Sequence, residues 1–424
     1  MLAADPQIAV VGGGVVGCAV AHALARRGVH AVLLEAEADL ALGASGANSG
    51  ILHTGFDSKP GELETRLILR AAALREELLE ELGVDVWRCG ARLTPNGADQ
   101  RAAVTTLAQN ARSNGVEADL DADGSLRVPG ESIVDPVAFV RALAGAAQAG
   151  GAKLRLGARV IGLAAASCEA PTGARDEGAA ARRGVCVEVE TGERLHVLAA
   201  VNCAGLYADD VAHGAGDDLV EVYPRKGEFL VFAAPQGPQL EEILLPVPSA
   251  LGKGVLVFPT LDRRAVIAGP TARERADKRD WSVERDAGEL IVAKARSMYP
   301  ALDGLEPSAA YAGLRPAGRD ANYVIERSKT IPGLVHVAAI RSTGMSASLA
   351  IGEHLVAMLA EEGAITPGPV RSLPSPSPSF SPSSSSSSAS RGPDGSVTPQ
   401  TWWERAARRS EAPPAGAPAS RESP

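Results

Sequence analysis

The alternation of apolar and polar positions predicts a β-α-β unit at the start of the chain. Consecutive apolar residues at 8–11 predict a strand, and small apolar residues at helical spacing predict a helix from about Val15 to Arg27, with Gly28 as its C-terminal cap. A second apolar run at 31–35 predicts another strand. Such units are normally parallel and right-handed, so the pattern favours an α/β fold with a Rossmann-like parallel sheet.

Further helices and an antiparallel sheet are predicted along the chain. Leucines at helical spacing indicate a helix from about Glu62 to Leu82. Asp135 is a preferred N-cap residue and Pro136 suits the first helical turn, so a helix to about Ala149 is expected. The same reasoning predicts strands at 153–165, 184–189, 195–201 and 335–339, an antiparallel sheet between 220 and 268, and helices at 282–298 and 349–362.

These elements predict two lobes and a tail. The first lobe is a discontinuous FAD-binding domain at 1–95, 130–215 and 311–368, and the second is an antiparallel-sheet substrate domain at 216–310 with parts of 96–129. Residues 369–424 are rich in Ser and Pro and are expected to be disordered, because such a segment cannot bury enough apolar area to offset the entropy of ordering. Trp402 and Trp403 interrupt this tail, either docked on the body or exposed to solvent.

Residues 12–17 read GGGVVG, which is the G-x-G-x-x-G spacing of a dinucleotide-binding turn. The three glycines allow a tight turn, close approach of a diphosphate and close packing of helix on strand. Free N–H groups at the helix N-terminus stabilise phosphate charge, and an acidic residue at the end of the second strand suits ribose hydroxyls. The cofactor contacts expected in this unit are Gly12, Gly14, Val16, Gly17 and Glu35.

The glycine motif fits both FAD and NAD, but further segments favour FAD through a resemblance. Residues 43–56, GASGANSGILHTGF, resemble the second flavin-contacting stretch of the D-amino-acid-oxidase-like FAD enzymes, in the branch of glycerol-3-phosphate dehydrogenase and L-2-hydroxyglutarate oxidase. Segments 202–209, 224–228, 252–255, 313–316 and 340–345 also resemble that branch. The resemblance implies FAD as cofactor and adds these contacts: Ser45, Asn48, Ser49, Gly50, Ala204, Gly205, Gly344, Met345 and Ser346.

The chemistry that this resemblance implies is hydride transfer from a C–H bond to flavin N5. His53 matches the histidine of the flavin-contacting stretch and is the candidate general base; the alternative is a histidine that only hydrogen-bonds the flavin or a carbonyl group. Arg315 lies where these enzymes bind an anion, and its planar guanidinium suits a carboxylate or phosphate. Lys226, Lys253 and Arg341 are additional candidates for binding substrate charge; the alternative for each alone is a surface or structural cation.

Composition and charge narrow the class of protein. The 424 residues carry a formal net charge of -9, so no general attraction to nucleic acid is expected, and no apolar run is long enough to span a membrane. The five cysteines are scattered without a C-x-x-C pair, so no metal site is expected. A strand near Ile8 leaves no room for a leader segment, which favours a cytoplasmic location.

The sequence therefore predicts an FAD-dependent oxidoreductase that oxidises a small anionic hydroxy compound, such as glycerol 3-phosphate or a 2-hydroxy acid. The electron acceptor is left open between oxygen, a quinone and a carrier protein. Two alternatives remain at this point. The same fold suits an amino-acid or secondary-amine oxidase, and a flavin-binding protein without turnover is the alternative of another class.

Overall fold

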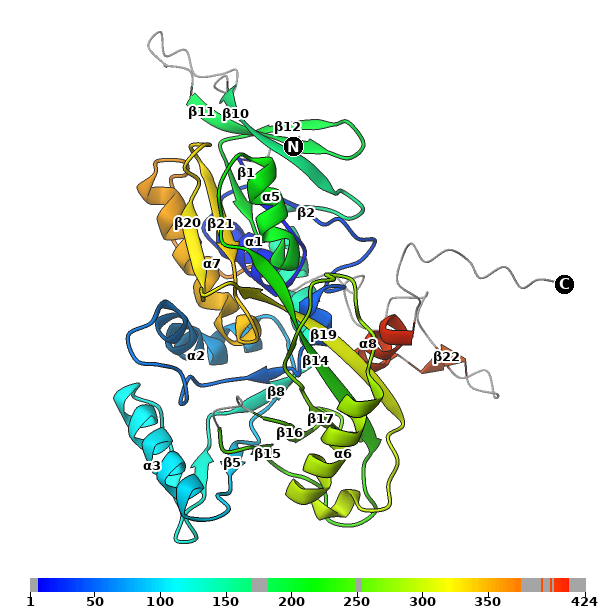
Figure 1. The fold of residues 1–424 in the computed structure, drawn as a ribbon. Helices are drawn as coiled ribbons and strands as arrows, with labels where there is room; N and C mark the ends of the chain where they lie inside the picture. The colour runs from blue at the N-terminus through cyan, green and yellow to red at the C-terminus, as the bar shows by residue number, and fades with distance from the viewer. Residues whose placement is uncertain are drawn as a thin grey trace, which may run out of the picture.

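The structure is a computed structural model that describes residues 7–168, 182–248, 254–374, 390–391, 397–398 and 400–411. Within these ranges the elements form two lobes joined by long strands (Figure 1). One lobe carries β1, β2, β20, β21 and α7, and the other carries β5, β15–β17 and α6. No helix among the described residues is long and apolar enough to cross a membrane.

The first lobe is built on a mostly parallel sheet with the strand order β20-β21-β13-β1-β2-β9. Every neighbouring pair in it is parallel except β20 with β21. Its strands are β1 (Ile8–Val11), β2 (Ala31–Leu34), β9 (Lys153–Arg155), β13 (Ala199–Asn202), β20 (Val324–Arg327) and β21 (Leu334–Ala338). The predicted α/β fold with a Rossmann-like sheet is therefore confirmed.

Helices cover this sheet and complete its core. Helix α1 packs against α4 and α7, and α2 packs against α7. Their apolar faces join the largest cluster of buried side chains in the described structure. These helices are α1 (Val15–Arg26), α2 (Leu63–Glu81), α4 (Pro136–Ala149), α5 (Ala208–Gly214) and α7 (Gly344–Glu361). The Asp135 carboxylate caps α4 by accepting from the Val137 and Ala138 amides, as its residue type predicts.

The second lobe is built on a larger sheet in which most neighbours are antiparallel. Its long strands β14 and β19 pair over ten residues, and α6 packs against β14. The strands are β5 (Ala91–Leu93), β6 (Asp119–Leu120), β7 (Leu126–Val128), β14 (Val222–Ala233), β15 (Ile243–Leu245), β16 (Leu256–Pro259), β17 (Ala265–Gly269), β18 (Arg273–Glu274) and β19 (Ala309–Gly318); the helices are α3 (Ala98–Ser113), α6 (Arg285–Met298) and η3 (Pro300–Leu302). Strand β19 thus belongs to this sheet, although the predicted boundary at residue 311 assigns it to the first lobe.

Three small sheets and two short helices complete the described structure. Strand β8 pairs with both β3 and β4, and β11 pairs with both β10 and β12. The remaining elements are β3 (Ile51–Leu52), β4 (Val86–Trp87), β8 (Ser132–Val134), β10 (Val160–Cys168), β11 (Arg182–Val189), β12 (Arg194–Val197), β22 (Ser390–Arg391), β23 (Val397–Thr398), η1 (Ala44–Ala47) and η2 (Gly205–Tyr207). The β3–β8 pairing brings residues around 53 and 131 together.

The structure corrects the predicted start of the last helix of the first lobe. Helix α7 begins at Gly344 rather than at Leu349. The Ser/Gly-rich composition of this segment indicates a turn, but its hydroxyl groups find partners inside the protein. Ser346 Oγ accepts from the His53 amide, and Ser348 Oγ donates to the Met345 carbonyl. Tertiary packing therefore overrides the weak local helix propensity.

The expectation of a disordered tail is wrong for residues 402–411. They form helix α8, which packs against β19 and η1 (Figure 1). The Thr401 amide donates to Glu404 Oε2 and the Glu404 amide donates to Thr401 Oγ1, which is a capping box. The T-x-x-E spacing of residues 401–404 is a local sequence signal for the start of a helix. Most of the predicted tail, including the serine run, lies outside the described residues.

Candidate functional site

The predicted glycine turn connects β1 to α1 in a conformation that depends on glycine. Gly12 has a φ of +108°, and a Cβ atom there would lie 2.5 Å from the Cys203 carbonyl oxygen. A Cβ atom at Gly17 would lie 2.0 Å from the Gly12 carbonyl oxygen, so helix and strand meet without room for a side chain. At Gly14 a Cβ atom would lie 3.2 Å from Ser45 Oγ, where it would narrow the space above the helix N-terminus.

Glu35 lies at the carboxyl end of β2 and faces this turn. Its Oε2 atom accepts from the Gly13 amide at 2.5 Å, and its Oε1 atom accepts from the Glu37 amide at 2.8 Å. Burial raises the pKa of Glu35, and the two amide hydrogen bonds oppose that rise. The carboxylate is therefore fixed beside the glycine turn, in the position where an acidic residue suits a ribose.

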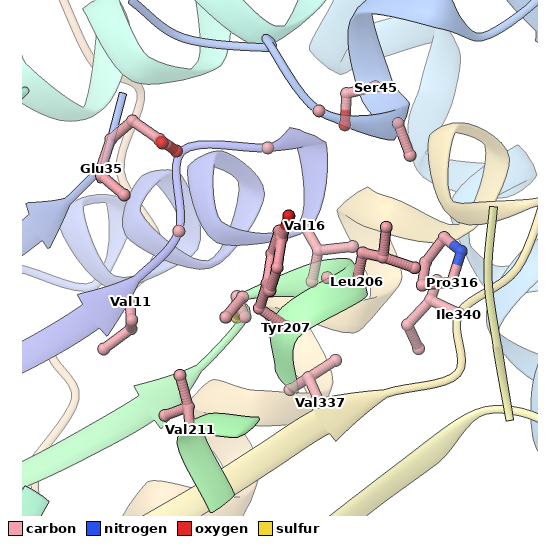
Figure 2. Close-up of a pocket in the computed structure, with 18 of the residues that line it drawn as sticks. Val11, Val16, Glu35, Ser45, Leu206, Tyr207, Val211, Pro316, Val337 and Ile340 are labelled. Atoms are coloured by element: carbon pink, nitrogen blue, oxygen red, sulfur yellow. The ribbon is translucent and has the colours of Figure 1, made fainter. Parts of the chain in front are cut away.

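A cavity of about 490 Å³ follows the carboxyl ends of β1, β2, β13 and β21. Figure 2 shows Glu35 at one end of the view and Pro316 with Ile340 at the other, with the Tyr207 ring between them. Ligands of open α/β sheets bind at this edge. Ten of the predicted cofactor contacts line the cavity: Gly12, Gly14, Val16, Glu35, Ser45, Asn48, Ala204, Gly205, Gly344 and Met345. Arg341, a predicted substrate ligand, lines it as well.

Four other predicted cofactor contacts lie outside the lining, three of them in or beside the loop between η1 and β3 and one in the glycine turn. The Gly50 amide donates to Asn48 Oδ1, and the Ile51 amide donates to Ser49 Oγ. Ser346 holds the His53 amide, and Gly17 closes the turn from the helix side. These residues shape the loop and the turn next to the cavity.

The cavity fits the dinucleotide FAD. Gly14 has no side chain of its own, the N-terminus of α1 lies at the cavity, and Ser45 Oγ accepts from the Val15 amide at 2.9 Å. Free amides and a positive helix end favour a diphosphate at this place. The walls between Val160–Leu163 and Leu206–Tyr207 are largely apolar, as the flat rings of a dinucleotide require.

His53 follows β3 and forms a short hydrogen bond with a residue that is far away in the sequence. Its Nδ1 atom lies 2.7 Å from Oε2 of Glu131, and the Glu131 side chain has no exposed surface. The second oxygen of Glu131 accepts from the Thr54 amide at 2.7 Å and from Thr54 Oγ1 at 2.9 Å. Arg75 donates to the carbonyl oxygens of Leu52 and His53 and fixes the strand end. The His53 side chain itself keeps 22% of its surface exposed.

Sequence reasoning did not identify Glu131. It lies in the turn before β8, next to Ser132, and the antiparallel pairing of Leu52 with Ser132 carries it beside His53. No local motif marks the residue, because the two partners are 78 positions apart. The register of a strand pair provides the contact, and periodicity alone does not predict that register.

Three arginines gather where β14, β19 and the loop after β21 meet. Arg225 and Arg315 are direct partners in the β14–β19 ladder, and the Arg341 amide donates to the Pro316 carbonyl. Arg315 keeps some accessible surface, yet burial, and then the charges of Arg225 and Arg341, lower the pKa of Arg315 to about 10. Among the described residues, none of the three side chains forms an ion pair with a carboxylate. Arg225 is a member of this cluster that sequence reasoning did not select.

The Arg315 guanidinium is held in place by backbone. Its Nη2 atom donates to the Thr271 carbonyl at 2.5 Å. Gly227 lies two residues beyond Arg225 on β14, and a Cβ atom there would lie 2.2 Å from the same Nη2 atom. Glycine is therefore needed at position 227 to make room for the arginine head.

The expectation that Lys226 binds substrate charge is not supported by its surroundings. The Lys226 side chain has no exposed surface, and its ammonium group pairs with Asp280 at 2.9 Å and Glu284 at 3.4 Å. Its charge is already neutralised on the side of β14 opposite to Arg225. Lys253, the other lysine candidate, lies outside the described residues.

Fold and cavity together define a two-lobe protein that holds a dinucleotide between a Rossmann-like sheet and an antiparallel sheet. The comparison with protein families identifies the family and the dinucleotide. The family model described as DAO, FAD dependent oxidoreductase, matches residues 7–358. The chain belongs to this family, which confirms the predicted enzyme class and FAD as the cofactor.

Individual relatives agree with this assignment. A glycerol 3-phosphate dehydrogenase of Caloramator mitchellensis is 29% identical over 83% of this chain and 73% of its own length. A glycerol 3-phosphate oxidase of Mycoplasma pneumoniae is 27% identical over 83% of this chain and 94% of its length. The human mitochondrial L-2-hydroxyglutarate dehydrogenase is 27% identical over 63% of this chain and 60% of its length.

Solved structures show the same fold. An L-alpha-glycerophosphate oxidase from Mycoplasma pneumoniae, reduced with dithionite and with FAD bound, superposes with a TM-score of 0.74 at 26% identity, covering 84% of this chain and 95% of that one. A glycine oxidase from Geobacillus kaustophilus has a TM-score of 0.70 at 23% identity, covering 84% of this chain and 94% of that one. The second similarity extends to the fold only.

Proposed function

We propose that this chain oxidises a small hydroxy compound that carries a dianionic group, with glycerol 3-phosphate as the favoured substrate. The observation that carries the proposal is the group of three arginines at positions 225, 315 and 341, which has no carboxylate partner in the described structure. Confined cations without an anion are unfavourable, so an anionic substrate stabilises the site. The relatives that match 83% of this chain are named for glycerol 3-phosphate.

The number of arginines favours phosphate over a single carboxylate. A guanidinium group donates two parallel hydrogen bonds to one oxyanion, and three such groups suit the three terminal oxygens of a phosphate monoester. Because Arg315 is held by the Thr271 carbonyl, its remaining donors have a fixed direction. A 2-hydroxy acid with two carboxylates, such as L-2-hydroxyglutarate, is the second candidate of this substrate class.

His53 is proposed as the base that takes the proton of the substrate hydroxyl. If Nδ1 donates to the Glu131 carboxylate across 2.7 Å, Nε2 is the ring nitrogen with the free lone pair. This basic nitrogen lies on the side of the ring away from Glu131. The carboxylate then stabilises the imidazolium formed when the proton arrives. Bound FAD supplies the acceptor for the hydride that leaves the same carbon.

Glu131 is proposed as a positioning residue, because its contacts with this site are to His53 and Thr54. Both of its oxygens lie within hydrogen-bond distance of these two residues, so neither oxygen of the buried carboxyl group lacks a partner. Thr54 holds one oxygen and thereby aims the other at the imidazole. The strand end at His53 is fixed from the other side by Arg75, which contacts the backbone carbonyls.

Anaerobic reduction of the bound flavin tests the proposed substrate class. Glycerol 3-phosphate should bleach the flavin absorbance, whereas glycerol, which lacks the anion, should not. In Arg315→Met the half-saturating concentration of glycerol 3-phosphate should rise by roughly 30-fold or more, because truncating one partner of a buried charge pair costs about 2–5 kcal/mol. The FAD content of this variant should equal that of the wild type.

Other outcomes of the same panel would contradict the proposal. Reduction by glycine alone would assign the chain to amine oxidation. Equal reduction by glycerol and glycerol 3-phosphate would remove the anion-binding role of the arginines. A protein that binds FAD but is reduced by no compound of the panel, L-2-hydroxyglutarate included, would be a flavin-binding protein without this activity.

A further inference from the structure

Helix α8 is anchored to the second lobe by an aromatic contact. Trp402 is buried, and its ring meets the Tyr311 ring edge-on with 5.6 Å between the centroids. Tyr311 in turn stacks on Phe229 at 4.8 Å. Ala406 and Ala407 are buried on the same helix. Aromatic pairs of this kind contribute beyond their buried area, so the helix has a specific docking site on β19.

Polar contacts attach the same helix to both lobes. Ser410 Oγ accepts from the Ala312 amide of β19 at 2.9 Å. This amide lies on the edge of β19 that faces away from β14, so the hydrogen bond gives it a partner. Arg405 forms a 2.9 Å ion pair with Asp39, in the segment that follows β2, and Arg141 of α4 shares the same carboxylate. The helix therefore spans the boundary between the first lobe and the second.

The last turn of α8 carries an arginine into the cofactor cavity. Arg409 lines this cavity together with Gly14 and Glu35. Its guanidinium lies over the Trp281 ring at 3.8 Å, and its Nη1 atom is buried without a hydrogen-bond partner in the described structure. Burial lowers the pKa of Arg409, which indicates that its surroundings do not fully compensate the charge.

The neighbouring carboxylates do not form an ion pair with Arg409 among the described residues. Glu35 and Glu37 influence Arg409 electrostatically, but neither lies within ion-pair distance of it among the described residues. Glu35 is already hydrogen-bonded to the backbone amides of Gly13 and Glu37. A buried donor without a partner is costly, so an anion bound in this part of the cavity would stabilise Arg409.

We propose that helix α8 is a clasp over the FAD cavity and that Arg409 pairs with the diphosphate of the bound cofactor. The diphosphate is the anionic part of a dinucleotide, and the glycine turn with the N-terminus of α1 provides its place in the same cavity. The family match ends at residue 358, so α8 lies outside the part of the chain that the family model matches. Docking of the helix closes the cavity by bridging both lobes.

Binding of FAD and ADP to the apoprotein tests the clasp, and it is independent of the substrate. Four proteins are compared: the wild type, a chain that ends at residue 399, Arg409→Gln, and Arg408→Gln as a matched control. Arg408 is the exposed neighbour on the same helix and does not line the cavity. Quenching of flavin fluorescence gives the Kd for FAD, and calorimetry gives the Kd for ADP.

Arg409→Gln should raise both Kd values by the same factor, roughly tenfold or more, because it removes a charged hydrogen bond. The shortened chain should lose at least as much affinity, and FAD should dissociate from it faster. Arg408→Gln should stay within about twofold of the wild type, because it removes the same charge from the helix without reaching the cavity. Melting of each apoprotein separates a loss of folding from a loss of binding.

Three results would overturn the proposal. An unchanged Kd for FAD in Arg409→Gln would leave the arginine without a ligand in the cofactor. A weaker FAD complex with unchanged ADP binding would place Arg409 at the flavin half instead of the diphosphate. Tighter FAD binding by the shortened chain would make α8 an obstruction to the cofactor rather than a clasp.

Discussion

Replacing Glu131 with glutamine is the sharpest test of the proposed proton transfer. The substitution keeps the shape of the side chain and an oxygen for the Thr54 amide, but it removes the negative charge 2.7 Å from His53 Nδ1. The charge matters when His53 has taken the substrate proton and become an imidazolium. Substrate binding involves the arginine cluster and should be affected much less.

The expected magnitude follows from the lost interaction. A hydrogen bond to a charged group contributes about 1.5–3 kcal/mol, and each 1.36 kcal/mol of barrier is about tenfold in rate. Glu131→Gln should therefore slow flavin reduction by roughly 10- to 150-fold. His53→Asn removes the base itself and should slow it by roughly 10²–10⁴-fold. The double variant should be little slower than His53→Asn alone, because Glu131 acts through His53.

Anaerobic stopped-flow absorbance at varied glycerol 3-phosphate concentration separates the limiting rate of flavin reduction from the half-saturating concentration. Asp217→Asn is the matched control, since Asp217 also forms a buried carboxylate–histidine pair, with His336 at 3.0 Å, and its other hydrogen bonds are to residues 328–330, away from His53. It should lower stability without changing the reduction rate. A wild-type rate in Glu131→Gln, or fully additive losses in the double variant, would refute the coupling of Glu131 to His53.

Other predictions address the anion site, the cofactor turn and acid stability. Gly227→Ala should displace the Arg315 guanidinium and raise the half-saturating substrate concentration at least tenfold in the same assay, whereas Gly288→Ala, with open space around it, should not. Gly14→Asp should abolish FAD retention, measured as flavin absorbance of the purified protein, because a carboxylate would meet the diphosphate. Burial alone would raise the pKa of Asp217, but hydrogen bonds lower it from 3.8 to about 2, so its stabilising contribution is present above pH 3.8 and is lost as the pH falls toward 2. Acid unfolding of Asp217→Asn should therefore lack this part of the pH dependence, and an identical acid limb in both proteins would contradict it.

Local sequence signals were sufficient for the cofactor side of the site. The glycine spacing requires only that a strand, a turn and a helix follow one another, and its backbone consequences appear at Gly12 and Gly17. The same β-α-β unit places Glu35 at the end of its second strand, where an acidic residue is expected. The segment at 43–56 resembled a flavin-contacting stretch, and the family comparison confirmed FAD. The capping box at Thr401 and Glu404 was equally local, so the helix that it starts was readable too.

The opposite side of the site required the tertiary structure. His53 meets Glu131 because β3 pairs with β8 in one register, and Arg225 meets Arg315 because β14 pairs with β19 in one register. A shift of either register by one residue would turn these side chains to the other face. The same alternation separates the paired Lys226 from the anion site.

The sequence by itself determined the Rossmann-like unit, because periodicity and motif spacing are properties of neighbouring residues. Its resemblance to a known family implied FAD as the cofactor and His53 and Arg315 as candidates. Only the tertiary structure decided what surrounds those candidates. It supplied a carboxylate for His53, two further arginines for Arg315, and an arginine from the tail for the cofactor cavity. Such contacts join residues from distant parts of the chain, and they depend on strand register and on the docking of a helix against packed aromatic rings, which no local pattern specifies.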